Sequence, residues 1–134
     1  FGTLSDKKLS IFGFAFKANT NDTRESPSIN ISRYLLEEGA QISIYDPKVT
    51  EKQILSEFKN IKFDKNVKIS NLALKAAEGS DAILVLTEWE EFKKLNWQEI
   101  YSVMRKPCWL FDARICLDKN YLKEIGFNLW TLGN

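Results

Sequence analysis

The five-residue run 82–86 (Ala-Ile-Leu-Val-Leu) is the most apolar stretch of the chain, and it constrains the fold more than any other feature. A strand with one face in water alternates apolar and polar residues, whereas this run has no polar position. We therefore expect a strand that is buried on both faces, as in a parallel sheet that carries helices on both sides.

Shorter strand and helix patterns alternate along the rest of the chain. Besides 82–86, strands are expected at 7–12, 41–45, 67–69, 108–111 and 127–132. Helical spacing or composition indicates a helix before Gly39 and others at 51–59, 71–78, 88–94, 97–104 and 121–125. This alternation predicts an α/β fold, a three-layer Rossmann-like domain with a mainly parallel sheet of about five to six strands. A length of 134 residues suits one such domain.

The clearest helix boundary in the sequence is Ser26-Pro27. Serine is a favoured N-cap, and proline is tolerated at the first helical position because the N–H that it lacks has no partner there. Gly39 ends the same helix in the usual C-terminal position.

Charge and composition exclude several classes of partner. The chain has 19 basic and 18 acidic residues, so it lacks the basic excess of nucleic-acid-binding proteins. No apolar run approaches the length of a membrane span and no signal peptide opens the chain, so no membrane partner is expected. Cys108 and Cys116 form no CxxC or zinc pattern, and we expect both to be buried structural residues in a reducing cytoplasm.

The chain contains no histidine. This removes the commonest general base and the Ser-His and Cys-His nucleophile pairs. We expect no metal site within the chain, because its two cysteines form no zinc pattern. Because its first residue is Phe1 rather than Met, we also expect the chain to be a piece of a longer protein.

Ligands of parallel sheets bind beyond the carboxyl ends of the strands. In this chain that rule selects three segments, 13–25, 87–89 and 112–114. The first segment lies where dinucleotide-binding folds carry G-x-G-x-x-G, but only the first glycine is present. Its backbone amides therefore cannot wrap a pyrophosphate as closely as that motif does.

The first segment instead offers two cations, Lys17 and Arg24, before the helix that begins near Ser26. A helix N-terminus carries unpaired N–H donors and partial positive charge, and arginine and lysine suit phosphate oxygens. Anion binding is one interpretation. The other is that Lys17 is solvated and that Arg24 pairs with Asp22 or Glu25.

Asp46 and Arg114 each follow an expected strand. Asp46 stands where an NAD-binding fold places its ribose-binding acid, but without the glycine fingerprint we favour a role in shaping the turn with Pro47. Arg114 lies on the expected ligand side, although a structural pairing with Asp112 or Asp118 is the alternative.

The segment Thr87-Glu88-Trp89 follows the central strand. Thr87 is a candidate N-cap for the next helix, and Trp89 is expected to pack in the core. A catalytic role for Glu88 would need a partner acid or base, and none is evident in the sequence. Nothing around Cys116 would activate its thiolate.

Five of these segments together resemble the C-terminal domain of UDP-glucose 6-dehydrogenases, members of the UDP-glucose/GDP-mannose dehydrogenase family. They occur in the family's order and cover nearly the whole chain: Gly13-Phe14-Ala15-Phe16-Lys17, Asp22-Thr23-Arg24-Glu25-Ser26-Pro27-Ser28, Tyr45-Asp46-Pro47-Lys48-Val49, Thr87-Glu88-Trp89 and Phe111-Asp112-Ala113-Arg114.

The resemblance implies a three-part enzyme that oxidises UDP-glucose twice, to UDP-glucuronate, with NAD as cofactor. The N-terminal part binds most of the NAD, a central helical part makes a homodimer or higher oligomer, and the catalytic cysteine lies in the parts before this domain. Residues 1–6 then correspond to the end of the central linker, and residues 7–134 to the C-terminal domain that binds the UDP-sugar. On this basis the isolated chain is expected to be inactive.

The resemblance also assigns roles by position. Phe16, Lys17 and Arg114 match residues that contact the UDP-sugar, and Arg24 matches the arginine that reaches across the cleft to NAD. One departure is Ala113, where relatives often have glycine, and an added methyl group there should matter little.

There are three alternatives to this assignment: one stays open, and specific residues argue against the other two. GDP-mannose and UDP-N-acetylhexosamine dehydrogenases share this domain, although Thr87-Glu88-Trp89 looks more like the UDP-glucose branch. A non-catalytic receiver-like signalling module would need acids after the first strand to bind Mg²⁺, and that position carries Gly-Phe-Ala-Phe-Lys. A complete small NAD enzyme lacks both the glycine fingerprint and a general base.

Overall fold

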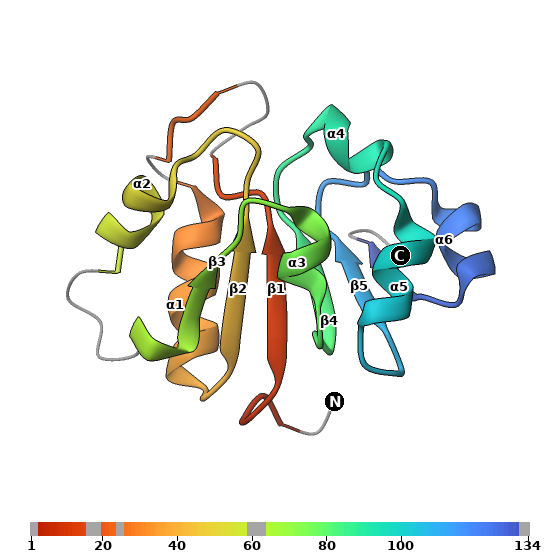
Figure 1. Cartoon of the computed structure of the whole chain (residues 1–134), viewed down its shortest axis with the longest axis horizontal. Coiled ribbons are helices and arrows are strands. Elements are labelled where there is room, and N and C mark those ends of the chain that lie inside the picture. Colours follow the sequence, from red (N-terminus) through yellow and green to blue (C-terminus); the bar gives the residue numbers. More distant parts are fainter. Residues whose placement is uncertain (1–2, 16–19, 24–25, 59–63, 132–134) are drawn as a thin grey trace.

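A computed structural model describes residues 3–15, 20–23, 26–58 and 64–131 of the chain. These residues form one six-stranded sheet in which every pairing is parallel, in the order β3-β2-β1-β4-β5-β6 (Figure 1). The expected α/β class and parallel sheet are confirmed. The strands are β1 (Lys8–Phe12), β2 (Gln41–Tyr45), β3 (Val67–Ile69), β4 (Ala82–Val85), β5 (Trp109–Asp112) and β6 (Asn128–Thr131).

The direction of the chain across the sheet reverses at β1. The chain moves outward from β1 to β2 and β3, and then returns to place β4 on the other side of β1. Right-handed crossovers in opposite directions put the connecting helices on opposite faces of a sheet. Accordingly, α3 lies in front of β1 in Figure 1 and α1 lies behind the sheet. The edge beyond β1 and β4 is therefore a switch point, where such sheets bind ligands.

The helices agree with the sequence patterns, although most are shorter than expected. The expected boundary at Ser26-Pro27 is confirmed, because the Ser26 side chain accepts the N–H of Ser28 and Gly39 follows the last turn with a φ of +90°. The helices are α1 (Pro27–Glu37), α2 (Glu51–Ser56), α3 (Ala73–Ala77), α4 (Glu90–Lys93), α5 (Trp97–Val103) and α6 (Lys119–Ile125), with a 3₁₀ turn at Asp64–Asn66. Among the described residues, no helix has the length and apolar character needed to cross a membrane.

The two faces of β4 differ in how completely they are covered. Ala82, Ile83 and Val85 are buried as the sequence predicts, but Leu84 is only half-buried. Leu84 and the half-buried Phe111 of β5 line an apolar hollow together with residues from β1 and α1. The expectation of burial on both faces is thus confirmed for most of the run and wrong at Leu84, since the helices that follow β4 and β5 pack on the opposite face.

Aromatic side chains fill the space between the sheet and α4 and α5. The ring of Phe12 lies 5.6 Å from that of Phe92 and 5.9 Å from that of Trp97, measured between centroids. The Trp97 indole N–H also donates to the Phe92 carbonyl at 2.8 Å. This packing supports the carboxyl end of β1, beside which the candidate site lies.

Candidate functional site

Four strands end at the same edge of the sheet, and the segment after each carries polar groups that contact one another. These segments are Gly13 to Ala15 after β1, Asp46 after β2, Thr87 to Trp89 after β4, and the loop that follows Asp112 in β5. Because all six strands are parallel, their carboxyl ends meet at one rim. We call these segments the switch-point rim.

Gly13 makes the turn out of β1 and approaches Thr87 very closely. Its φ is +100°, and a Cβ atom placed there would lie 2.6 Å from both the Cβ and the Oγ1 of Thr87. Only glycine fits this conformation and this spacing. The Gly13 carbonyl also accepts the Ser28 hydroxyl at 2.8 Å, which holds the turn to the first residues of α1.

The Asp46 carboxylate holds two loops together. Its Oδ1 accepts the N–H groups of Lys48 and Val49 at 2.8 and 2.9 Å, which shapes the turn after β2 as the sequence predicts. Its Oδ2 accepts the N–H groups of Phe14 and Ala15 at 2.7 and 3.0 Å. A dinucleotide-binding fold would use an acid at this position to bind a ribose. Here both oxygens of the Asp46 carboxylate accept backbone N–H groups instead.

The structure corrects the role expected for Thr87. Thr87 is fully buried and its hydroxyl donates to the Ala15 carbonyl at 2.9 Å, while the N-cap of α4 is Trp89, without a side-chain cap. Thr87 lies three residues before the helix, too early to reach its free amides. The packing expected for Trp89 is confirmed, and its indole N–H donates to Asp46 at 3.2 Å.

Arg114 lies in the loop after β5, and its side chain is anchored by an acid from another segment. Its Nε donates to Oε2 of Glu88 at 2.5 Å. The sequence alternative, a side-chain pairing with Asp112 or Asp118, is therefore wrong. Asp112 contacts Arg114 through the backbone instead, accepting its N–H at 3.2 Å. No pattern in the sequence pointed to the Glu88 contact, because the two residues are far apart along the chain.

The loop that carries Arg114 is wound around Asp112. The buried carboxylate of Asp112 accepts the N–H groups of Cys116 and Leu117, each at 2.9 Å. Ile115 takes a positive φ of 53° so that the chain can turn around the carboxylate. The sequence has the same pattern at Asp46, an acid at the end of a strand before a short loop. That pattern could have predicted that Asp112 binds the backbone amides of the loop that follows it.

Neither cysteine has the environment of a nucleophile. Both are free thiols, and Cys108 is buried as expected, whereas Cys116 is only half-buried, contrary to expectation. Partial burial, followed by the charge and the hydrogen bond of Asp112, raises the pKa of Cys116 to about 12. At neutral pH this thiol is therefore protonated and poorly reactive.

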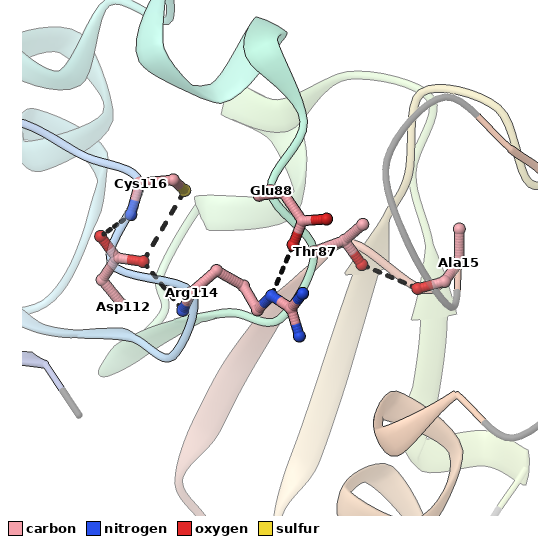
Figure 2. A network of polar contacts seen from close by, with 6 residues as sticks. All are labelled: Ala15, Thr87, Glu88, Asp112, Arg114 and Cys116. Atoms are coloured by element: carbon pink, nitrogen blue, oxygen red, sulfur yellow. Dashed lines mark hydrogen bonds and ion pairs between the residues drawn. The ribbon is translucent and has the colours of Figure 1, made fainter. Parts of the chain in front are cut away.

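The contacts at the rim form a path from the loop after β1 to Arg114. Figure 2 shows the Arg114 side chain reaching from the β5 loop toward Glu88, with Thr87 bonded to Ala15 beyond it. Three of the predicted site residues, Phe16, Lys17 and Arg24, lie outside the described residues. A hollow of about 290 Å³ also opens at this edge, beside the end of β2, and Arg114 is not among its lining residues.

Comparison with protein families gives a match over most of the chain. Residues 10–119 match the model described as the UDP-glucose/GDP-mannose dehydrogenase family, UDP binding domain. The chain is 44% identical over 137 residues to UDP-glucose 6-dehydrogenase of Caenorhabditis elegans, covering 99% of this chain and 28% of that protein. It is also 44% identical over 148 residues to UDP-glucose 6-dehydrogenase 4 of Arabidopsis thaliana, covering 99% of this chain and 31% of that protein. The chain thus spans less than a third of the length of these relatives.

Solved structures share the fold. A UDP-D-ManNAc dehydrogenase from Pyrococcus horikoshii superposes with a TM-score of 0.76 at 26% identity, covering 98% of this chain and 26% of that one. An NDP-N-acetyl-D-galactosaminuronic acid dehydrogenase from Methanosarcina mazei Go1 superposes with a TM-score of 0.81 at 22% identity, covering 98% of this chain and 26% of that one. At that identity the second likeness supports the fold alone.

Proposed function

Because this chain belongs to the UDP-glucose/GDP-mannose dehydrogenase family, we propose that it is the nucleotide-sugar-binding, C-terminal domain of a UDP-glucose 6-dehydrogenase. Residues 7–134 form this domain and residues 1–6 end the linker that precedes it. The complete enzyme oxidises UDP-glucose to UDP-glucuronate with NAD. The rest of an enzyme as long as its relatives, more than two thirds of the length, would bind most of the NAD and supply the catalytic residues.

The observation that carries this proposal is the position of Arg114. Its guanidinium is held at the switch-point rim by Glu88, next to the segment that Thr87 ties to Ala15. Arginine presents planar pairs of N–H donors that match phosphate and sugar oxygens. An anionic nucleotide at this rim would therefore find a fixed cation at the β5 side.

Phe16 and Lys17 are proposed to contact the UDP-sugar from the β1 side, and Arg24 is proposed to reach NAD. These assignments rest on the match of the segment 13–28 to the family's motif. Lys17 would act as a point charge on the diphosphate, and Phe16 would supply an apolar surface. The capped amide of Ser28 is already bonded to Ser26, so it is not one of the proposed donors.

The chain itself would bind and orient the substrate without reacting with it. NAD, when bound by the complete enzyme, accepts the hydride. This chain has no histidine, and the thiol of Cys116 is held protonated, so neither a histidine base nor a Cys116 thiolate is available here for the oxidation. A cytoplasmic location and a homodimer or larger homo-oligomer belong to the same proposal, and the two free cysteines fit a reducing compartment.

The choice of UDP-glucose over GDP-mannose and UDP-N-acetylhexosamine rests on the Caenorhabditis elegans and Arabidopsis thaliana relatives, which are UDP-glucose 6-dehydrogenases at 44% identity. A receiver-like module is disfavoured by the geometry of Asp46. A phosphorylated aspartate must be open to a phosphate donor, whereas the oxygens of Asp46 are bonded to backbone amides and the Trp89 indole.

Titration with UDP, UDP-glucose and GDP, followed by NMR, tests the proposal. We expect UDP and UDP-glucose to bind weakly, with GDP weaker still, and shifted signals to cluster in the segments after β1, β4 and β5. Substituting Lys17→Ala should weaken UDP binding by about 1.5–3 kcal/mol, the range of a charge-assisted hydrogen bond. Lys75→Ala on α3 is the matched control. An unchanged affinity would remove Lys17 from the site, and no UDP binding at all would reject the proposed function.

A further inference from the structure

The contact between Glu88 and Arg114 engages only one part of the guanidinium. An arginine side chain has five N–H donors, and the Nε–H is the one that Glu88 accepts, at 2.5 Å. Within the part of the chain that the structure describes, no acceptor takes a hydrogen from the two Nη atoms of Arg114. The pair therefore fixes the orientation of the guanidinium and leaves its Nη donors for a ligand.

We propose that Glu88 is a positioning residue that orients Arg114 for an anionic nucleotide at the switch-point rim, an inference that rests on the proposed function. Glu88 does not itself bind the anion. Glu88 accepts the Nε–H and so limits the rotamers that Arg114 samples before the ligand binds. Less side-chain entropy is then lost on binding.

The surroundings of the two residues support this division of roles. Glu88 stands between two anchored neighbours, because Thr87 is bonded to Ala15 and Trp89 is bonded to Asp46. Arg114, in contrast, follows β5 in a partly exposed loop and precedes Ile115, a residue that is 62% exposed. The anchored segment after β4 thus holds Glu88 in place, and the exposed loop after β5 supplies Arg114, the residue proposed to bind the ligand.

A role in stability alone does not account for the pair. The Arg114 and Glu88 side chains keep 40% and 35% of their surface exposed, and ion pairs so exposed contribute little to folding. The carboxylate also adds repulsion toward an anion bound next to it. If the acid serves to order Arg114, that ordering must outweigh the repulsion, and the two effects can be separated by substitution.

Titration of the full 134-residue chain with UDP, followed by NMR, separates the ordering of Arg114 from the repulsion between Glu88 and the anion. Glu88→Ala removes both the charge and the acceptor, and we expect UDP to bind about fivefold more weakly, the scale of ordering one long side chain. Glu88→Gln removes the charge but keeps an acceptor for Nε–H, and it should bind UDP within about twofold of the wild type. Glu90→Ala, which removes an acid that pairs with Lys93 at the surface, is the matched control and should leave the affinity unchanged.

Two further measurements make the outcome decisive. In an Arg114→Ala background, Glu88→Ala should no longer weaken UDP binding, because there is no guanidinium left to orient. The Nε–H signal of Arg114, observed without ligand, should be protected from solvent exchange in the wild type and lose that protection in Glu88→Ala. Equal affinity for Glu88→Ala and wild type, or an unprotected Nε–H in the wild type, would overturn the positioning role. Absence of UDP binding to the wild type would instead reject the proposed function, and the Nε–H signal would still test the contact.

Discussion

Asp46 at the end of β2 and Asp112 at the end of β5 are both buried acids that bind backbone amides, but they connect different parts of the molecule. Asp46 accepts from Phe14 and Ala15 in the loop after β1 and from Trp89 after β4, besides the turn that follows it. Among the described residues, the donors to Asp112 all come from its own loop, at Arg114, Cys116 and Leu117.

This difference separates a region that holds the scaffold from one that presents a side chain. Around Asp46 the contacts cross three strands, so that turn, sheet and core depend on one another. Around Asp112 the contacts are local, and the loop keeps Arg114 partly exposed at the rim. The same residue at the same kind of position can therefore serve the fold or the site, depending on how far along the chain its partners lie.

The largest expected effect tests the scaffold region. We expect Asp46→Ala to lower the free energy of unfolding by about 3–4 kcal/mol, because several buried donors lose their acceptor at once. Urea denaturation measures this value, with Asp112→Ala as the comparison. A loss for Asp46→Ala that is no larger than the loss for Asp112→Ala would remove the distinction between the two acids.

Gly13→Ala should cost nearly as much, about 2–4 kcal/mol, since the added methyl group would meet Thr87 and the backbone has a positive φ. Gly79→Ala is the matched control. Gly79 also has a positive φ, of +68°, but nothing lies within 4 Å of its added Cβ, so only the conformational cost of about 1 kcal/mol remains. Similar losses in both variants would show that the close approach to Thr87 does not matter.

Asp112→Ala should cost less in stability, about 1–2 kcal/mol, while weakening UDP binding several-fold, because the loop that carries Arg114 loses its acceptor. Asp118→Ala removes the N-cap of α6, whose side chain accepts the Tyr121 N–H at 3.2 Å, and should cost about 1 kcal/mol with no change in UDP binding. Combined denaturation and UDP titration compare the two. A normal UDP affinity in Asp112→Ala would argue against its role in presenting Arg114.

The smallest effect concerns the thiol of Cys116 and its pH dependence. The folded state raises the pKa of this thiol from 9.0 to about 12, so the unfolded chain loses the proton first as the pH rises. Cys116 therefore contributes stability below about pH 9 that is lost progressively toward pH 12. Alkylation of Cys116 at about pH 9, followed by peptide mass spectrometry, should be far slower in the folded chain than in urea. Asp112→Asn should accelerate it by removing a neighbouring charge.

Local patterns in the sequence predicted the elements well. The alternation of strands and helices, the start of α1 at Ser26-Pro27 and the turn at Asp46 were confirmed. The errors occurred where the partner is distant in sequence. Thr87 is a candidate N-cap of α4 in the sequence and instead bonds Ala15, 72 residues earlier. The structural alternative for Arg114, a side-chain pairing with Asp112 or Asp118, is replaced by the contact with Glu88, 26 residues earlier.

The sequence by itself determined which segments become strands and helices and at which edge the polar groups gather. Hydrophobic periodicity and capping residues act over a few positions, and a parallel sheet sends all its carboxyl ends to one side. Only the tertiary structure decided which acid meets which donor, because the strand order β2-β1-β4-β5 brings Asp46, Ala15, Thr87 and Arg114 to neighbouring strand ends. Contacts of that kind depend on distances across the sheet, which the spacing of residues along the chain does not specify.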